Sequence, residues 1–240
     1  MRRSDFRLDG MYFSFRAGNP GDYIQGHHLS GLVYELDELR MLVARLGPKP
    51  VILDVGANVG NHSVYLSKSI PGATIYPVEP GRDAVELLRA NLRHNRCHNV
   101  DRRFIGVGFS DAPSTSVLRR VSKTNLGGSR VVTGDELAAL GDQVDNPEWF
   151  EDVRLVRGDA AVGDIAPTFV KIDVEGAEMS VLRGLDAVIR RHRPEIFVEV
   201  ERPNQEEFLA WLESVHYVVD LRLDPSGARS NYLVRPVTAS

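Results

Sequence analysis

Carboxylates beside a glycine-rich turn are the first residues in this sequence whose types and spacing could do chemistry. Asp54 lies two residues before the first glycine of the turn GANVG (56–60), and Glu79 follows the next apolar segment. An apolar strand that breaks into a glycine turn and then a helix presents backbone N–H groups to a nucleotide-like ligand. A side chain in place of glycine would block the tight turn or the close approach of that ligand. The pattern therefore predicts a nucleotide-like ligand at the carboxyl ends of these strands.

The spacing within the turn separates two kinds of nucleotide ligand. A dinucleotide-binding turn reads G-x-G-x-x-G, and the turn 56–60 lacks that triple-glycine spacing. A carboxylate at Asp54 would repel a pyrophosphate but attract the amino group and the sulfonium of S-adenosylmethionine. Glu79 could accept both ribose hydroxyls, although nicotinamide enzymes also place an acid there. The turn favours S-adenosylmethionine, with a dinucleotide oxidoreductase as an alternative.

Composition and length limit what the chain can be. It has 240 residues, 42% hydrophobic and 26% charged, which predicts one domain over 1–240 with a substantial core. A net charge of −4 disfavours a nucleic-acid partner held by phosphate contacts. Cys97 is the only cysteine, which excludes an internal disulfide and fits a reducing compartment. Without a signal peptide or a bilayer-spanning segment, the sequence predicts a cytoplasmic protein with no membrane partner; its oligomeric state stays open, a homodimer included.

Apolar β-branched segments alternate with segments of helical periodicity. The predicted strands are 51–55, 73–78, about 102–109, 168–174 and 195–201, and the predicted helices are 60–69, 82–95, 177–191 and 205–214. This order predicts a parallel sheet with right-handed crossovers. Strands 217–223 and 229–236 flank a turn signal at 224–227 and predict an antiparallel hairpin at the sheet edge. The predicted fold class is α/β, mostly parallel with an antiparallel C-terminal hairpin, which is typical of methyltransferases that use S-adenosylmethionine.

Two segments are expected to embellish this sheet. Residues 1–47 predict an N-terminal cap, with a hairpin around Asp9-Gly10, a glycine-rich loop and a helix over 32–46. Residues 110–165 interrupt the alternation and predict a β-rich insertion over one face. Its predicted elements are strands at 116–122, 129–132 and 155–158 and a short helix at 135–140. Its apolar content is too small for an independent core.

Several segments together resemble one family. They are LDVGANVGNHS (53–63), VEP (78–80), the NxG turn at 125–127, FVKIDVEGAEMSVLRG (169–184) and EIFVEVE (195–201). The chain is similar here, over about 22–201, to the FkbM-type methyltransferases. The resemblance implies a class I, Rossmann-like fold and methyl transfer from S-adenosylmethionine to a hydroxyl of a sugar or other natural product. Residues 135–165 depart from the family pattern, which leaves the acceptor open.

The resemblance also assigns residues to the cofactor. Asp54 would receive the ammonium of the methionine part, directly or through water, and Glu79 would bind the ribose diol. The adenine would lie at the end of the strand 104–111, against Ser110 or Asp111, unless these two form a plain turn. The residues expected to bind the cofactor are Asp54, Gly56, Ala57, Asn58, Gly60, Asn61, Glu79, Pro80, Gly106, Ser110, Asp111 and Asp173.

Methyl transfer to a hydroxyl requires alignment of the acceptor oxygen, exclusion of water and removal of the hydroxyl proton. Acids at the ends of strands 168–174 and 195–201, and a histidine pair near the N-terminus, are groups able to take that proton. The candidate catalytic residues are Asp173, Glu175, Glu199 and His28. The candidate acceptor-binding residues are Tyr23, His27, Tyr34, Glu35, Lys171, Glu178 and Glu201.

Simpler roles compete with these assignments. Glu178 would be favoured at a helix start by the helix dipole alone, and Lys171 could form an internal ion pair with Asp173. An adjacent histidine pair is more often loop surface than catalyst. No spacing demands a metal and no metal site is predicted, although three acids could bind magnesium, namely Asp173, Glu199 and Glu201. An amine acceptor, or a non-catalytic module that binds S-adenosylmethionine, remains an alternative function.

Overall fold

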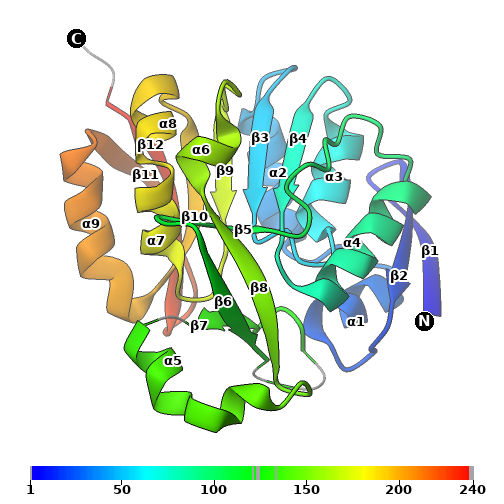
Figure 1. Cartoon of the computed structure of the whole chain (residues 1–240). Helices are drawn as coiled ribbons and strands as arrows, with labels where there is room; N and C mark the ends of the chain where they lie inside the picture. Colours follow the sequence, from blue (N-terminus) through cyan, green and yellow to red (C-terminus); the bar gives the residue numbers. More distant parts are fainter. Residues whose placement is uncertain (1, 121, 123–124, 133, 238–240) are drawn as a thin grey trace.

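The computed structural model describes residues 2–120, 122, 125–132 and 134–237 (Figure 1). Within these residues the elements follow in this order: β1 (Arg2–Leu8), β2 (Met11–Ala17), α1 (Tyr23–Leu29), α2 (Leu36–Arg45), β3 (Val51–Val55), α3 (Asn61–Ser69), β4 (Thr74–Val78), α4 (Arg82–His94), β5 (Gly108–Ser110), β6 (Ser114–Arg119), β7 (Arg130–Val132), α5 (Gly134–Leu140), the 3₁₀ helix η1 (Gly141–Asp145), β8 (Phe150–Arg157), α6 (Gly158–Val162), β9 (Phe169–Ile172), α7 (Glu178–Gly184), α8 (Asp186–His192), β10 (Glu195–Glu201), the 3₁₀ helix η2 (Arg202–Asn204), α9 (Gln205–Ser214), β11 (Tyr217–Ser226) and β12 (Arg229–Pro236). No helix in these ranges is long and apolar enough to cross a membrane.

The central sheet has the strand order β11-β12-β10-β9-β3-β4. Strands β4, β3, β9 and β10 run parallel to one another. Strand β12 runs antiparallel to β10, and β11 antiparallel to β12, so the predicted C-terminal hairpin forms the edge of the sheet. The chain leaves β3 for β4 on one side and returns to β9 on the other side. This reversal of strand order leaves a crevice at the carboxyl ends of β3 and β9, where ligands of open α/β sheets bind.

Side-chain alternation along the strands produces a core on each face of the sheet. Ile52 and Phe169 contribute to the cluster that contains residues of β2, α2, α3 and α4. Their neighbours Leu53 and Val170 contribute to the other cluster, with α7, α8 and α9. Successive strand residues point to opposite faces, so buried apolar residues in sequence supply both cores. Figure 1 shows the hairpin β1–β2 beside α4 and, at the opposite edge of the molecule, α9 with β11 and β12.

One predicted strand and one predicted helix differ from the structure. Of the strand expected at about 102–109, only the end is a strand, as part of β5, which belongs to a second sheet. Ile105 makes an isolated pairing with Glu79, directly after β4, and Val100 makes one with Ile75 of β4. A turn at 103–104 and the positive φ of Gly106 (109°) interrupt the extended chain. The helix expected over 177–191 is divided into α7 and α8. Leu185 lies between them with φ −104° and ψ 10°, outside the helical range, directly after Gly184.

The N-terminal cap forms the predicted hairpin, but the glycine-rich loop is partly helical. Strands β1 and β2 pair on either side of Asp9-Gly10. Helix α1 begins after Asp22, whose carboxylate accepts the N–H of Gln25 at 2.9 Å and caps the helix. Helix α2 begins at Leu36, later than expected, because Glu35 adopts a left-handed conformation with φ 53°.

The insertion builds a second sheet with the order β5-β8-β6-β7. The predicted antiparallel pair is present as β6 and β7, although part of the predicted strand 116–122 lies outside the described residues. Strand β8 is longer than the expected 155–158 and pairs with both β5 and β6. A small buried cluster of Leu118, Val153 and Leu155 supports this sheet. We therefore keep the proposal that 1–240 form one domain, with 110–165 as an insertion.

Gly184 allows the insertion to contact α7. A Cβ atom at this position would lie 2.1 Å from the carbonyl oxygen of Ser110 at the end of β5. We expect Gly184→Ala to lower the free energy of unfolding by about 1–3 kcal/mol in urea titrations, because this backbone contact must open. Alanine in a helix would otherwise stabilise the chain by up to about 1 kcal/mol.

The matched control for this change is Gly47→Ala, since a Cβ at Gly47 would meet nothing within 4 Å. That variant should change stability by no more than about 0.5 kcal/mol. An unchanged or raised stability of the Gly184 variant would show that β5 is not held closely against α7.

Candidate active site

A cavity of about 270 Å³ lies at the carboxyl ends of β3, β4, β9 and β10. The main sheet contributes 55–58, 78–81 and 173–175 to its walls. Tyr34 and Glu35 close it from the N-terminal cap, and the loop 125–129 closes it from the insertion. That loop is fastened to the cap, because Asp22 accepts the N–H of Leu126 at 2.7 Å. The cavity is thus built by the sheet, the cap and the insertion together.

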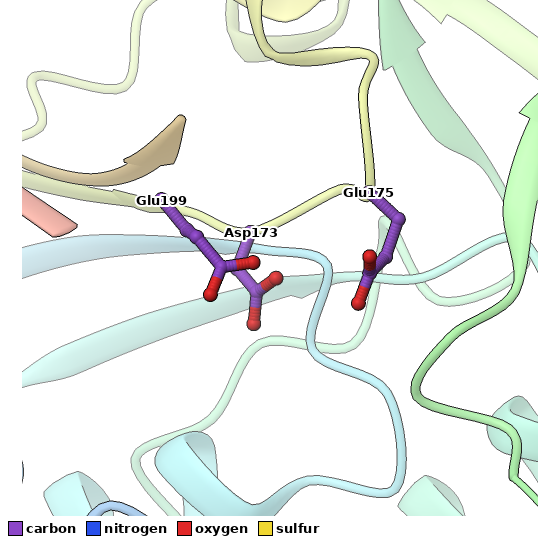
Figure 2. A group of neighbouring side chains, drawn as sticks. All are labelled: Asp173, Glu175 and Glu199. Atoms are coloured by element: carbon purple, nitrogen blue, oxygen red, sulfur yellow. The ribbon is translucent and has the colours of Figure 1, made fainter. Parts of the chain in front are cut away.

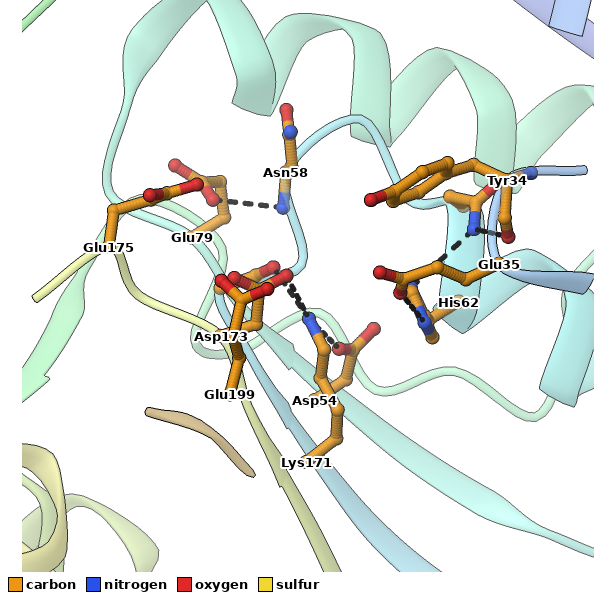
Figure 3. Close-up of polar contacts among 12 residues, drawn as sticks. Tyr34, Glu35, Asp54, Asn58, His62, Glu79, Lys171, Asp173, Glu175 and Glu199 are labelled. Atoms are coloured by element: carbon orange, nitrogen blue, oxygen red, sulfur yellow. Dashed lines mark hydrogen bonds and ion pairs between the residues drawn. The ribbon is translucent and has the colours of Figure 1, made fainter. Parts of the chain in front are cut away.

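Glu79 connects the glycine turn to the end of β4. One carboxylate oxygen accepts the N–H group of Asn58 at 2.9 Å (Figure 3). The other accepts the N–H group of Gly81 at 2.8 Å. Burial raises the pKa of Glu79 to about 7 against the opposing effect of these two hydrogen bonds. Glycine is required at position 56, because a Cβ atom there would lie 1.7 Å from the carbonyl oxygen of Asp173. The turn is therefore fixed by β9 as well as by its own sequence.

A buried lysine and two carboxylates form an ion-pair network at the floor of the cavity. The Lys171 ammonium is 3.2 Å from Asp173 Oδ2 and 3.7 Å from Asp54 Oδ1, and it donates to the carbonyl of Gly56 at 3.2 Å. Burial disfavours the charge of Lys171, but the surrounding carboxylates, Asp173 first among them, outweigh it and hold its pKa above the usual value. Asp54 is fully buried, accepts from Ser63 at 2.5 Å and does not reach the cavity wall. A direct contact of Asp54 with a ligand ammonium is therefore not available in this conformation, and the expected contact through water stays a prediction.

Three carboxylates gather at the opposite end of the cavity. Oxygens of Asp173, Glu175 and Glu199 lie within 4.8 Å of one another (Figure 2). Burial raises the pKa of Glu199 to about 8, with the Asp173 charge acting in the same direction, and burial also raises the pKa of Glu175. Such a cluster offers oxygen atoms to a divalent cation, but Lys171 and Arg229 already supply positive charge to it.

Residues of the N-terminal cap and of α3 complete this end of the cavity. Glu35 Oε2 lies 3.1 Å from His62 Nε2. Burial alone would raise the pKa of Glu35, but the contact with His62 outweighs it and lowers that pKa to about 2. The side chain of Asn61 holds Tyr34 by accepting its N–H at 3.0 Å and donating to its carbonyl at 2.8 Å. Tyr23 lies at the cavity mouth and is 61% exposed.

The structure removes both histidines of the pair from the cavity wall. His28 is fully buried, stacks on Phe15 at 3.7 Å and donates through Nε2 to Asn61 Oδ1 at 2.9 Å. Burial lowers the pKa of His28 to about 4. His27 contacts the carbonyl of Tyr23 at 2.8 Å and lies outside the wall. Helix α1 causes this, because its register turns His28 toward the core, so the expectation of a catalytic His28 is corrected.

Four residues expected to bind the cofactor also lie outside the wall. A Cβ at Gly60 would lie 2.7 Å from Leu88 Cδ1, so Gly60 serves helix packing. Gly106 is exposed in the interrupted segment beside β4. Ser110 and Asp111 bind Ser180 of α7 at 3.0 Å. The wall near the expected adenine position is formed instead by Gly108, Phe109, Leu118 and Leu155.

Two expected acceptor-binding acids have structural partners elsewhere. Glu178 is buried and accepts the N–H of Gly176 at 3.1 Å and the side-chain amide of Asn204 at 2.7 Å. Glu201 lies against Gly176 on the same side. Neither acid lines the cavity, because the turn 175–177 lies between them and the crevice. The predicted residues that do line it are Gly56, Ala57, Asn58, Asn61, Glu79, Pro80, Asp173, Glu175, Glu199, Tyr23, Tyr34, Glu35 and Lys171.

Sequence reasoning missed several residues of the wall. His62 lies two residues after the glycine turn, and this position was the signal that could have identified it. Its partner Glu35 could not be identified from sequence. Arg229 comes from the C-terminal hairpin and Arg120 from the insertion, and nothing local marks either residue. Arg120 binds Glu151 at 3.1 Å and Asp83 at 3.0 Å, which ties the insertion to α4.

Comparison with known proteins gives a consistent picture. The family model described as the methyltransferase FkbM domain matches residues 54–219. A hexuronic acid methyltransferase, AglP of Haloferax volcanii, is 29% identical over 154 residues, covering 63% of this chain and 56% of that protein. The 31-O-demethyl-FK506 methyltransferase FkbM of Streptomyces tacrolimicus is 32% identical over 164 residues, covering 59% of this chain and 61% of that protein. The chain thus spans less than two thirds of the length of these relatives.

A solved structure shares the fold. The methyltransferase FkbM of Methylobacillus flagellatus KT superposes with a TM-score of 0.58 at 19% identity, covering 88% of this chain and 52% of that one. The predicted α/β methyltransferase fold is confirmed.

Proposed function

Because the chain belongs to the FkbM methyltransferase family, we propose that it transfers the methyl group of S-adenosylmethionine to a hydroxyl of a small molecule, such as a sugar or a secondary metabolite. The observation that carries the proposal is one cavity with two chemically different ends. One end has the glycine turn, Glu79 and an apolar wall, and the other has a cluster of carboxylates. The relatives named for a hexuronic acid and for 31-O-demethyl-FK506 support a small hydroxylated acceptor.

The first end fits the methyl donor. Each oxygen of Glu79 accepts one backbone N–H and retains a lone pair for a ribose hydroxyl. Phe109, Leu118 and Leu155 offer an apolar surface for adenine. The ammonium of the methionine part would be bound by Asp173, with Asp54 acting from below through Lys171. When bound, the cofactor supplies a methyl group activated by its sulfonium.

The second end suits removal of the acceptor proton. Glu199 lines the cavity, and its pKa of about 8 is near the range in which a general base works at neutral pH. Tyr34, Glu35 and His62 form the wall nearby and can orient the acceptor by hydrogen bonds. The loop 125–129 and the cap restrict the entry of water. We propose Glu199 as the general base.

Replacing Glu79 with alanine tests the cofactor end. We expect the Kd for S-adenosylhomocysteine, measured by calorimetry, to rise about a hundredfold, because the two ribose hydroxyls lose the carboxyl group that accepts their hydrogen bonds. Glu79→Gln should retain part of the affinity. Glu178→Gln is the matched control outside the cavity and should leave the Kd unchanged. Absence of S-adenosylhomocysteine binding by the native protein would refute the cofactor assignment.

An amine acceptor is the second candidate. The cavity carries Glu35, Asp173, Glu175 and Glu199 against Lys171 and Arg229, an excess of negative charge that would attract a cationic amine. Transfer of an isotopic methyl group to a panel of amino sugars and hydroxylated metabolites, followed by mass spectrometry, identifies the methylated atom. A label on nitrogen supports this second candidate, a label on oxygen supports the first, and no label on any acceptor supports a non-catalytic binding module.

A further inference from the structure

Arg229 reaches the carboxylate cluster from a part of the chain outside the matched family segment. It is the first residue of β12, beyond the end of the 54–219 match. The antiparallel pairing of β10 with β12 places Arg229 opposite Glu201 and Asn231 opposite Glu199. This register directs the Arg229 side chain over Glu199, and the guanidinium lines the cavity. The position is therefore set by the hairpin rather than by any sequence near the acids.

The Arg229 guanidinium contacts Glu175 and Glu199 in different ways. Glu175 is held at both oxygens, with Nη1 to Oε1 and Nη2 to Oε2 each 3.1 Å. Glu199 is held at one oxygen, with Nη1 to Oε2 at 2.7 Å. Nη1 donates one hydrogen to Glu175 Oε1 and the other to Glu199 Oε2. Oε1 of Glu199 therefore accepts no hydrogen bond from Arg229. That oxygen remains available to a molecule in the cavity.

We infer that Arg229 is a positioning residue that holds Glu199 with Oε1 free and favours its charged form, so that Glu199 can take the proton of the acceptor hydroxyl. The inference rests on the proposed function. Glu199 Oε1 takes the hydroxyl proton as the acceptor oxygen bonds to the methyl carbon and the electron pair of the carbon–sulfur bond stays on sulfur. Arg229 then stays in place, because Glu175 still holds it by a hydrogen bond to Nη1 and an ion pair with Nη2.

The charges that face Glu199 agree with this role. Asp173 and Glu175 disfavour its ionised form, and burial does so most strongly. Arg229 opposes all three by its charge and by its hydrogen bond. Lys171 lies on the far side of Asp173, and the hydroxyl of Tyr34 is also close enough to sense Asp173 and Glu199. Arg229 is the cation in direct contact with Glu199 among the described residues.

The test follows the carboxyl carbon of Glu199 by NMR in protein labelled at the glutamate side-chain carboxyl, with the signal assigned from Glu199→Gln. In Arg229→Gln we expect the titration midpoint of Glu199 to rise by at least about one pH unit. Arg229→Lys retains the positive charge but not the two-nitrogen geometry of the guanidinium. Its Glu199 midpoint should lie between those of the native protein and Arg229→Gln. Arg222→Gln is the control in the same hairpin, because exposed Arg222 pairs with Asp224 away from the cavity, and it should leave the midpoint unchanged.

Methyl transfer provides the second measurement. The rate is measured with an acceptor identified by isotopic labelling. In Arg229→Gln the rising limb of the pH profile of kcat/KM should move to higher pH by the same amount as the Glu199 titration midpoint. Binding of S-adenosylhomocysteine should stay unchanged. An unchanged Glu199 titration overturns the inference. A shifted titration with an unshifted rate profile also overturns it, because Glu199 is then not the proton acceptor. Absence of methyl transfer by the native protein instead refutes the proposed function, whatever Arg229 does to Glu199.

Discussion

Replacing Glu199 with glutamine is expected to lower kcat by about a hundredfold to ten-thousandfold and to leave the affinity for S-adenosylhomocysteine unchanged. An amide cannot take the acceptor proton, but it retains the size of the carboxylate and can still accept from Arg229. Glu199 lies at the end of β10, and Glu79 and the glycine turn lie at the ends of β4 and β3. Loss of rate without loss of cofactor affinity would place Glu199 in the chemical step.

The measurement is single-turnover methyl transfer from labelled S-adenosylmethionine to an identified acceptor. Glu201→Gln is the matched control, since Glu201 lies two residues further along the same strand and outside the cavity. That variant should transfer methyl groups within about twofold of the native rate. If Glu199→Gln keeps more than a tenth of native activity, Glu199 is not the general base, and Asp173 or Glu175 becomes the candidate.

The pH dependence of kcat/KM tests the same role of Glu199 as general base. The pKa of Glu199 is about 8, raised first by burial and then by Asp173, so the ionised base becomes more abundant as pH rises through 8. Below that value kcat/KM should rise about tenfold for each pH unit, and above it the rate should level off. Glu199→Gln should lose this limb. A native rate that falls as pH rises from 6 to 8 would contradict a carboxylate base at this position.

The part of the site that sequence could predict is the part that is local in sequence. The turn 56–60 follows its strand directly, and Glu79 ends the next strand, so their proximity follows from parallel pairing alone. The hydrogen bond from Asn58 N–H to Glu79 shows this proximity. Asp54 is instructive, because its position in the motif is as expected but its side chain turns to Lys171 beneath the floor. Alternation along a strand does not say which charged partner a buried acid meets.

The acceptor end could be predicted only in outline, because it is assembled from distant segments. Arg229 meets Glu199 through the register of β10 and β12, which no local pattern specifies. His28 was a candidate only as long as the segment after Gly21 was expected to be a loop. Once Asp22 caps a helix there, the helical register places Tyr23 at the cavity and His28 in the core. The interrupted segment 102–107 shows the same limit, since the positive φ of Gly106 overrides an apolar, strand-like sequence.

Replacing Lys171 with methionine is expected to lower the free energy of unfolding by about 3–5 kcal/mol, because two acids then face a buried apolar side chain. Lys171 is 3% exposed and is the cation between Asp54 and Asp173. Its pKa lies above the usual value of 10.5, so its contribution to stability is fully present at neutral pH and is lost only as pH rises through that raised pKa. Urea unfolding at pH 7, followed by circular dichroism, measures the loss.

A double variant separates the effect of charge from the effect of packing. Adding Asp54→Asn to Lys171→Met removes one of the two unpaired charges and should recover a large part of the lost stability, since the amide oxygen of an asparagine there could still accept from Ser63. Exposed Lys49→Met is the matched control and should change stability by less than about 0.5 kcal/mol. If the double variant is no more stable than Lys171→Met, the unpaired charge of Asp54 is not the source of the lost stability.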